Sequence, residues 1–406
     1  MNFNGQSAEI PGYNLPVTQW TIPLVNAYRS PNSSVSLVFV DNTPSDSGLR
    51  HWEQSTVSSA HYQSTTINPA NTPQLTHGQV NFKWDSGSSQ FELCPYNGPG
   101  GLIIDGAMHQ IPIECLTLTN AATTSSAINY FYAVSVDDDN ITVSGAADDG
   151  FGKIKLQVSD SRGNPGDLLG IRCVNIGGAI QANVRDTGKV IDSTHITLIN
   201  TSSAGMGTYT AGGNCWVFRL AATTTGHIAS NNGVEIMSGS LGGHYTLVGI
   251  AYIGGSHAVS DVSPKCDVAS WFNRRAKTCI NTYTSDHTWT STSAWGEPST
   301  EIRCEFVTFD DAHENAKSWS INGMFSNNTG GGGTLVGAGF SAISSVPAAE
   351  IIGEKGSNAP LSVHGAVSGL TEDVHYITLL AKTLTGGTST ITGTTPPTTA
   401  EIQLWQ

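Results

Sequence analysis

The cysteines are the residues of this 406-residue sequence that most directly suggest chemistry. No two of them form a C-x-x-C pair, and none lies beside histidines at the spacing of a zinc site, so we predict no structural metal. An odd number of cysteines indicates buried thiols in a reducing compartment, whereas oxidation outside the cell would pair most of them and leave one for a bond between subunits. The seven cysteines lie at positions 94, 115, 173, 215, 266, 279 and 304.

Two cysteine pairs are candidates for disulfides. Cys173 and Cys215 lie near the beginning and the end of one strand-rich region, and the first and last strands of a small closed sheet are often adjacent. Cys266 and Cys279 bracket the stretch CDVASWFNRRAKTC and form the second pair. We expect at least one disulfide in the mature protein.

That bracketed stretch combines two aromatic residues with three cations. As a strand it would alternate Phe272 and Arg274 with Trp271 and Arg275, and one of the two rings would face inward. A guanidinium beyond a buried ring can stack on it or bind a carboxylate through two hydrogen bonds. We expect a structural clamp, and a sugar- or phosphate-binding role is the alternative. The proposed clamp consists of Trp271, Phe272, Arg274, Arg275, Asp310 and Asp311.

Two tryptophans are candidates for glycan contacts. Trp289 and Trp295 lie in the polar stretch SDHTWTSTSAWGEPS, and exposed aromatic faces in such loops are platforms for sugar rings. Burial of both indoles inside the fold is the alternative.

The acidic residues form no recognisable catalytic motif. A two-carboxylate glycosidase needs carboxyl groups roughly 5 to 9.5 Å apart, a distance that a sequence does not give. H-E-x-x-H, G-x-S-x-G and Walker patterns are absent, and Asp137 to Asp139 fit a hairpin turn better than a calcium loop. We predict no enzymatic activity and no cofactor. The acidic candidates for the less favoured glycosidase are Asp105, Glu114, Asp148, Asp149, Asp310, Asp311 and Glu314.

The composition indicates an all-β protein. Charged residues make up 12% of the chain, against about 25% in typical domains, so little material exists for the wet faces of helices. The net charge of −14 disfavours nucleic acid and anionic membranes as partners. The first residues lack the pattern of a signal peptide, and no apolar run is long enough to cross a membrane, so we expect synthesis in the cytoplasm without membrane insertion.

The chain divides into four regions by composition and strand pattern. Residues 1–89 are polar and read as an extended N-terminal arm, and residues 90–145 form a β region that we expect to pack with the C-terminal part. Residues 146–222 form a small β-barrel, and residues 223–406 form an antiparallel, jelly-roll-like sandwich.

The barrel region resembles a known module. The segments GDLLGI, IQAN, VIDSTHITL and GTYTAGG are similar to the small β-barrel called the first catalytic-cysteine half-domain of ubiquitin-activating enzymes. That module recurs in appendage proteins of tailed bacteriophages as a spacer or docking unit. The resemblance implies no nucleophile, because the cysteine in its name belongs to a neighbouring half-domain.

The flanking regions resemble tail and appendage proteins of tailed phages. The segments that carry this resemblance are NGPGGLIIDGAMHQIP, YFYAVSV, GHIASNNGVEIMSG, SWFNRR and TEIRCEFVTFDDA, with SWFNRR the most specific. In those proteins YFYAVSV leads almost directly into GHIASNNGVEI, so the barrel reads as an insertion. The resemblance implies a structural virion subunit: a fibre, spike or decoration, a homotrimer attached to other virion proteins through its arm. A module that recognises a host surface glycan is the alternative.

Overall fold

The computed structural model describes the chain almost entirely as β-strands joined by turns and short 3-10 helices. It describes residues 38–40, 51–53, 79–96, 100–104, 107–135, 140–229, 235–239, 242–272, 276–309, 317–328, 333–341, 348–352, 359–384, 387–394 and 396–405. Within these ranges there is no α-helix, which confirms the all-β prediction. None of the described helices is long and apolar enough to cross a membrane.

The chain folds as two compact units. Unit 1 comprises Met1–Ala122 with Tyr130–Val248, and unit 2 comprises Thr123–Asn129 with Gly249–Gln406. In the predicted N-terminal arm, β1 (Val38–Val40) and β2 (His51–Glu53) form an antiparallel pair. Most of the arm lies outside the described residues.

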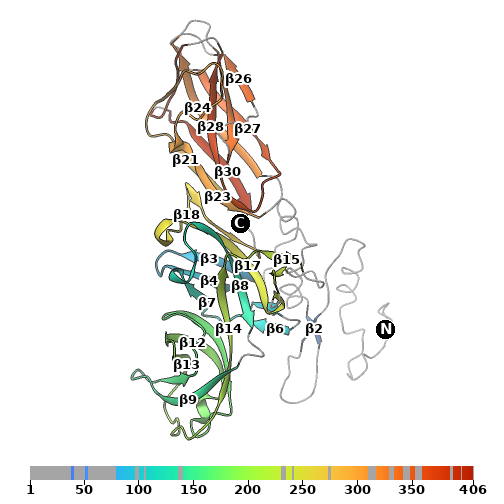
Figure 1. Ribbon diagram of the computed structural model, residues 1–406, viewed down its shortest axis with the longest axis vertical. Coiled ribbons are helices and arrows are strands. Elements are labelled where there is room, and N and C mark those ends of the chain that lie inside the picture. Colours follow the sequence, from blue (N-terminus) through green and yellow to red (C-terminus); the bar gives the residue numbers. More distant parts are fainter. Residues whose placement is uncertain are drawn as a thin grey trace, which may run out of the picture. The chain divides into compact units, whose positions relative to one another are not determined.

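A closed six-stranded barrel dominates unit 1 and is drawn mainly in green in Figure 1. Its strands follow one another in the order β11-β12-β13-β10-β9-β14, and pairing between β11 and β14 closes the ring. Along β10, buried Ile154, Leu156 and Val158 alternate with outward Lys153, Lys155 and Gln157, which is the period-two pattern of a strand with one wet face. The strands are β9 (Ile141–Asp148), β10 (Lys153–Val158), β11 (Leu168–Val174), β12 (Arg185–Asp192), β13 (His195–Ser202) and β14 (Asn214–Thr223).

The barrel core needs one glycine for its packing. A Cβ added to Gly188 would lie 2.7 Å from Ile196 and 2.9 Å from Leu169, closer than non-bonded carbon atoms approach. Gly188 therefore lets these two core side chains meet over the backbone of β12.

The last strand of the barrel extends beyond the barrel and pairs with the strand that precedes the barrel in the sequence. β8 (Ala127–Ser135) precedes it, and β14 returns from it, with Ser135 opposite Phe218 and Tyr130 opposite Thr223. Its first strand begins at Ile141, five residues before the boundary expected from the sequence. The segment ITVSGAAD was expected to form a hairpin with the preceding strand across Asp137 to Asp139, which placed it before the barrel. That pairing is wrong: β9 forms a hairpin with the following strand β10 and also pairs with β14.

A three-stranded sheet completes the described core of unit 1. It consists of β3 (Gln79–Asp85), β4 (Gln90–Tyr96) and β7 (Leu116–Thr119), and the hairpin of β5 (Gly101–Ile104) and β6 (Ala107–Gln110) lies between β4 and β7 in sequence. Residues 79–89, expected to belong to the arm, are thus part of this sheet. Phe91 packs against Phe131 of β8 at 4.2 Å between ring centroids, and Phe82 packs against Phe131 at 4.8 Å.

The sheet is tied to the barrel by side chains that bond backbone groups. The Thr119 amide donates to Asp167 Oδ1 at 2.7 Å, and the Leu168 amide donates to Thr117 Oγ1 at 2.8 Å. These bonds satisfy the backbone donors of the last residue of β7 and the first residue of β11. The other described elements of unit 1 are η3 (Asn120–Ala122), η4 (Ile180–Ala182), β15 (His227–Ala229), β16 (Glu235–Met237) and η5 (Gly242–His244).

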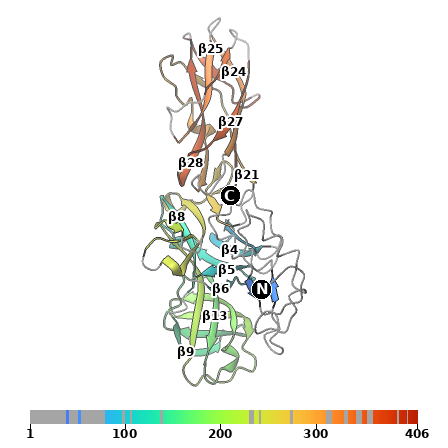
Figure 2. The same cartoon turned by 90° about the vertical axis from the view of Figure 1, so that its right-hand side faces the viewer.

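Unit 2 is a β-sandwich, the fold predicted for the C-terminal region. One sheet has the order β18-β19-β23-β28-β25-β26, and the other has the order β21-β30-β24-β29-β22 with β27 on β24. The pair β19–β23 is parallel and the other pairs of these two sheets are antiparallel. Figures 1 and 2 show most of these strands from two sides, in orange and red, and β18 is yellow in Figure 1.

The strands of the first sheet are β18 (Asp261–Val262), β19 (Lys265–Cys266), β23 (Cys304–Thr308), β28 (Asp373–Thr383), β25 (Gly333–Phe340) and β26 (Ala348–Ile352). Those of the second are β21 (Ala276–Thr282), β30 (Thr399–Trp405), β24 (Lys317–Asn327), β29 (Ser389–Ile391), β22 (His287–Trp289) and β27 (Ala359–Val367). β17 (Tyr245–Ile253) pairs with β20 (Val268–Ser270), and η6 (Gly255–His257) and η7 (Thr300–Ile302) are short turns.

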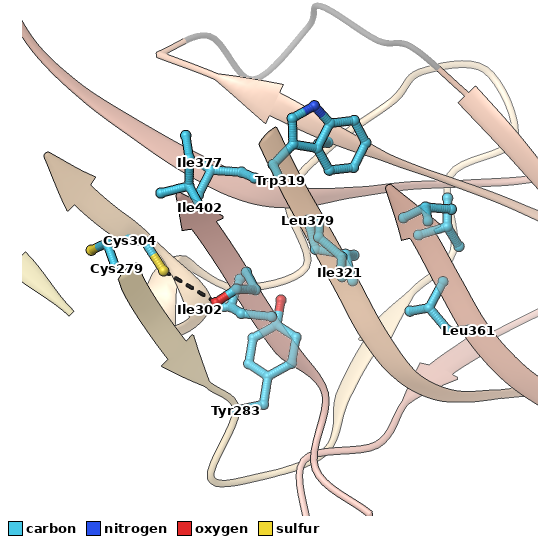
Figure 3. Close-up of a cluster of buried hydrophobic side chains, with 14 of the residues drawn as sticks. Cys279, Tyr283, Ile302, Cys304, Trp319, Ile321, Leu361, Ile377, Leu379 and Ile402 are labelled. Carbon is cyan, nitrogen blue, oxygen red and sulfur yellow. Dashed lines mark hydrogen bonds between the residues drawn. The ribbon is translucent and has the colours of Figure 1, made fainter. Parts of the chain in front are cut away.

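One apolar core fills the space between the two sheets of the sandwich. It includes Phe306, Ile377 and Leu379 from the first sheet, and Ile321 and Ile402 from the second. Figure 3 shows part of this cluster, with the side chains of both sheets pointing toward each other. Side chains on successive residues of a strand point to opposite faces, and these residues lie on the inner faces of the two sheets.

Candidate functional site

A disulfide between Cys173 and Cys215 lies at the seam that closes the barrel. The two residues are directly opposite each other on β11 and β14, with their Cα atoms 4.1 Å apart and a sulfur–sulfur bond of 2.02 Å. Both are buried. This is the pair that the strand order predicted, and the cross-link joins the strands that complete the ring.

A second disulfide, between Cys94 and Cys115, was not singled out from the sequence. It joins β4 to the residue before β7, and Cys115 has a φ of 73°. Glu92, Cys94 and Cys115 lie within 4.8 Å of one another at their ligand atoms. Because both sulfurs are held in the disulfide, they are not available as thiolate ligands for a metal. In the sequence, the only signal for this disulfide was two cysteines in or next to short strands. Their spacing alone does not show that they pair.

The remaining cysteines are thiols in the sandwich core, so the predicted bond between Cys266 and Cys279 is not present. The Cys279 thiol donates to the carbonyl oxygens of Pro264 and Glu305 at 3.2 and 3.4 Å. Cys304 Sγ donates to Ala400 O at 3.3 Å, the dashed line beside Cys279 in Figure 3. A hydrogen bond with Cys279 and burial both raise the pKa of Cys266 far above its usual range. These three thiols therefore behave as small apolar side chains. Buried thiols were one of the two outcomes expected for an odd number of cysteines.

The aromatic half of the expected clamp is buried. Trp271 and Phe272 follow the end of β20 and are 4% and 5% exposed. Both rings therefore face inward, whereas only one of them was expected to. Trp271 meets Phe309 edge to face at 5.0 Å between ring centroids. Because the strand ends at Ser270, period-two alternation does not apply to these residues. Arg274, Arg275, Asp310 and Asp311 lie outside the described residues, as do Asp105 and Glu314.

A clamp of the expected chemistry occurs at other residues. Arg303 donates two hydrogen bonds to Glu297, at 2.8 Å from Nε and 2.5 Å from Nη2, and its guanidinium lies 4.2 Å from the centre of the Tyr376 ring. Thr378 Oγ1 also donates to Glu297. This arrangement fixes the segment before β23 onto β28. Neither partner stood out in the sequence, because Glu297 and Arg303 are separated by a turn whose geometry only the fold supplies.

The two candidate glycan-binding tryptophans are half-buried. Trp289 packs against the sandwich core, and a Cβ added to Gly296 would lie 2.1 Å from its indole ring. Its ring is thus covered on one face by the loop that follows. Trp295 is also only half-buried, so it retains some exposed surface. The burial alternative fits the face of the Trp289 ring that this loop covers.

The described acidic candidates serve the fold around them. Glu114 accepts hydrogen bonds from Thr187 Oγ1 at 2.6 Å and Asn200 Nδ2 at 2.9 Å. Burial alone would raise the pKa of Glu114, but these two bonds outweigh it and lower the pKa. Hydrogen bonds from Ser203 and the Gly150 amide likewise lower the pKa of Asp148. A glycosidase acid needs a raised pKa, which neither carboxyl has.

The tip of the β9–β10 hairpin exposes an aromatic side chain on a well-ordered turn. Phe151 is 91% exposed. Asp149 Oδ1 accepts hydrogen bonds from the amides of Phe151 at 2.8 Å and Lys153 at 3.0 Å, and Gly150 and Gly152 take the positive φ values of 91° and 82°. The sequence DDGFGK carried the signal of such a turn, with a phenylalanine where polar residues are usual.

No family model matches the sequence, and no curated protein matches it. Among solved structures, the chain resembles dimeric latent PorU from Porphyromonas gingivalis, with 9% identity and a TM-score of 0.21, over 70% of this chain and 25% of that one. It therefore spans about a quarter of PorU. It also resembles the structure of the infectious bursal disease virus Gx strain, with 11% identity and a TM-score of 0.23, over 85% of this chain and 77% of that one. It resembles the VP2 subviral particle of the same virus with 11% identity and a TM-score of 0.22, over 80% of this chain and 74% of that one. At such TM-scores the likeness carries no argument about this chain.

Proposed function

We propose that this chain is a structural subunit of a tailed-phage virion, which projects as a fibre, spike or decoration and assembles as a homotrimer. Its role is to associate with other protein subunits, and it does not turn over a substrate. The motifs that resemble appendage proteins support the class of protein. The described carboxyls with lowered pKa values, Glu114 and Asp148, support the absence of glycosidase chemistry.

The observation that carries the proposal is the exposed aromatic tip of the barrel. The Asp149 bonds hold the backbone of Phe151, so the turn does not have to be ordered when a partner covers the ring. Ile180, 68% exposed, lies at the same end of the barrel, because Gln181 bonds Gly205 while Ser203 bonds Gly152. Aromatic anchors on preorganised turns are typical of the centres of protein interfaces.

Light scattering of the purified full chain, with Phe151→Asp and Ile113→Asp variants, tests the proposal. Ile113 is the matched control, because it is 83% exposed in unit 1 and does not belong to the β9–β10 hairpin. We expect the mass of a trimer for the wild type and for Ile113→Asp, and a lower mass for Phe151→Asp. A monomer at micromolar concentration for the wild type would contradict the trimer.

Electron microscopy of particles labelled with an antibody against the chain tests the virion assignment separately. The proposal expects label on projections outside the capsid or along the tail. Particles without label, alongside a chain that remains in the host lysate, would exclude a virion role.

A further inference from the structure

β27 is an edge strand of the sandwich in unit 2. It pairs with β24 along its whole length, from Val367 opposite Lys317 to Ala359 opposite Phe325. The strands β29 and β30 lie on the other side of β24. Within the described ranges, no strand pairs with the outer side of β27. A strand of nine residues in this position presents a long row of backbone groups to a partner.

The hydrogen bonds of β24 show which groups of β27 point outward. The Met324 carbonyl accepts from the amide and the hydroxyl group of Thr392, so Met324 bonds away from β27. In an antiparallel pair, residues that bond each other alternate with residues that do not. Pro360, opposite Met324, therefore points away from β24, a position that suits a residue without an N–H. The same alternation turns the N–H and C=O groups of every second residue outward. These residues are Ser362, His364 and Ala366.

The outward groups of β27 have no hydrogen-bond partner in the part of the chain that the structure describes. The side chains of Ser362, His364 and Ala366 are all exposed on the outer face of the sheet. Neighbouring Leu361 and Val363 point the other way and belong to the sandwich core. The strand is thus anchored on one face while its outer edge stays open.

The other edges of the sandwich are protected. Along β21, Ser263 Oγ donates to Thr278 O at 3.1 Å and accepts from the Ile280 amide at 3.1 Å, so a side chain covers that edge. β18, β22 and β26 have only two, three and five residues. Short strands, charged side chains and covering groups all hinder pairing at an edge. β27 is long and contains no Lys, Arg, Asp or Glu, and its one proline lies near its start.

A second copy of β27 provides a matching partner strand. With a two-fold axis at His364, this residue lies opposite its own copy, and Ser362 lies opposite Ala366 of the second copy. Each opposed pair exchanges two hydrogen bonds, so the outward amides of both strands are all used. Pro360 stays outside the bonded residues. Because serine and alanine are small, their side chains leave the two backbones free to approach.

Charge also favours contact at this strand. The net charge of −14 makes two copies of the chain repel each other at long range. An edge without charged side chains adds no further repulsion where the two backbones meet. β27 is therefore the edge of the sandwich at which a second copy can bind with the least electrostatic cost.

We propose that two copies of the chain associate through β27, as an antiparallel pair with a two-fold axis at His364. The pairing joins the second sheets of two sandwiches into one continuous sheet. It uses unit 2 and leaves the Phe151 turn of unit 1 free for the contact proposed above, so it adds to a threefold association. One strand edge is smaller than a standard interface, and we expect a Kd between about 10 µM and 1 mM.

Cysteine cross-linking of the full chain tests the register. Opposed residues of a bonded antiparallel pair have Cα atoms about 5.5 Å apart, a separation that a disulfide spans. His364→Cys should therefore form a covalent dimer after oxidation with diamide, measured on a non-reducing gel. The matched control is Ser318→Cys, which is exposed on the same face of the sheet but lies on β24, one strand in from the edge. The wild type, whose three thiols are buried, should give no covalent dimer.

Two charge variants test the contact without new cysteines. Ser362→Lys/Ala366→Lys places like charges opposite each other across the axis, and Ser362→Lys/Ala366→Glu places opposite charges there. Both variants change the same exposed positions, so the difference between them reports the contact and not the fold. Sedimentation equilibrium from about 1 µM to 1 mM measures the rise in mass above that of the dilute protein. We expect the like-charged variant to associate about tenfold more weakly than the wild type, and the oppositely charged variant to stay within about threefold of it or to associate more tightly.

Three results would each overturn the proposal. They are a wild-type mass that stays constant up to about 1 mM, equal dimer yields from His364→Cys and Ser318→Cys, and equal association of the two charge variants. An edge that is occupied by a segment of the same chain would give the first result. A failure of the trimer or of the virion role leaves this test intact, because it compares any two copies of unit 2.

Discussion

Asp267 carries a buried carboxyl group at the junction of β19 and β20. Its side chain is 4% exposed, Oδ2 accepts a hydrogen bond from the Ser260 amide at 3.1 Å, and Oδ1 has no hydrogen-bond partner. Burial raises the pKa of Asp267 to about 6, and the nearby carboxylates Glu305 and Asp261 add to the effect. The folded protein thus holds a proton that the unfolded chain releases near pH 4.

The consequence is a fall in stability as pH rises. Between about pH 4 and 6 the folded state binds more protons at Asp267 than the unfolded state does, so its contribution to the free energy of unfolding decreases by about 3 kcal/mol across this window. Asp267→Asn should remove that decrease. Urea unfolding at pH 4 and pH 7 measures it, and an identical pH dependence in wild type and variant would show that the carboxyl is not shifted.

The cysteines divide by chemistry at the level of single residues. Four are in disulfides and three are buried thiols. Alkylation in denaturant without reductant should therefore modify three cysteines, and alkylation after reduction should modify all seven. Mass spectrometry of peptides identifies the sites. Modification of Cys173 or Cys215 before reduction would contradict the seam disulfide.

At the scale of elements, two residues of the β9–β10 turn should differ in how much they contribute to the free energy of unfolding. Asp149→Ala removes the acceptor for two amides and should lower the free energy of unfolding by about 1 to 2 kcal/mol. Phe151→Ser, at a side chain 91% exposed, should change it by less than about 0.5 kcal/mol. Denaturant titration of both variants provides the comparison. A larger loss for Phe151→Ser would mean that the ring is covered within the chain.

The presence of β-strands could be predicted from the sequence, but most of the contacts between strands and between side chains could not. The low content of charged residues predicted the β class, and β10 (KIKLQV) shows the expected alternation although it was not singled out from the sequence. Cys173 and Cys215 could be paired because a closed sheet brings its end strands together. The Arg303–Glu297 pair depends on the path of a loop, which the periodicity of the sequence does not encode.

At the scale of the molecule, the two units differ in how they are stabilised. Both disulfides belong to unit 1, and all three thiols belong to unit 2. Each unit has its own apolar core. Calorimetry should therefore resolve a transition that reductant lowers by roughly 10 °C and another that reductant leaves in place. A parallel shift of both transitions would show that the units unfold as one.

The Cys173–Cys215 bond also limits how far the chain can be drawn out under mechanical load. The bond bridges residues 42 positions apart, and an extended chain spans about 3.4 Å per residue, so about 140 Å of contour is withheld from any pulled molecule. In single-molecule stretching from the two ends, rupture of the barrel should release a length increment shorter by that amount than in reduced protein. Residues 141–172, which carry β9 and β10, lie outside the loop that the bond closes and would still extend under load, whereas residues 173–215 would not.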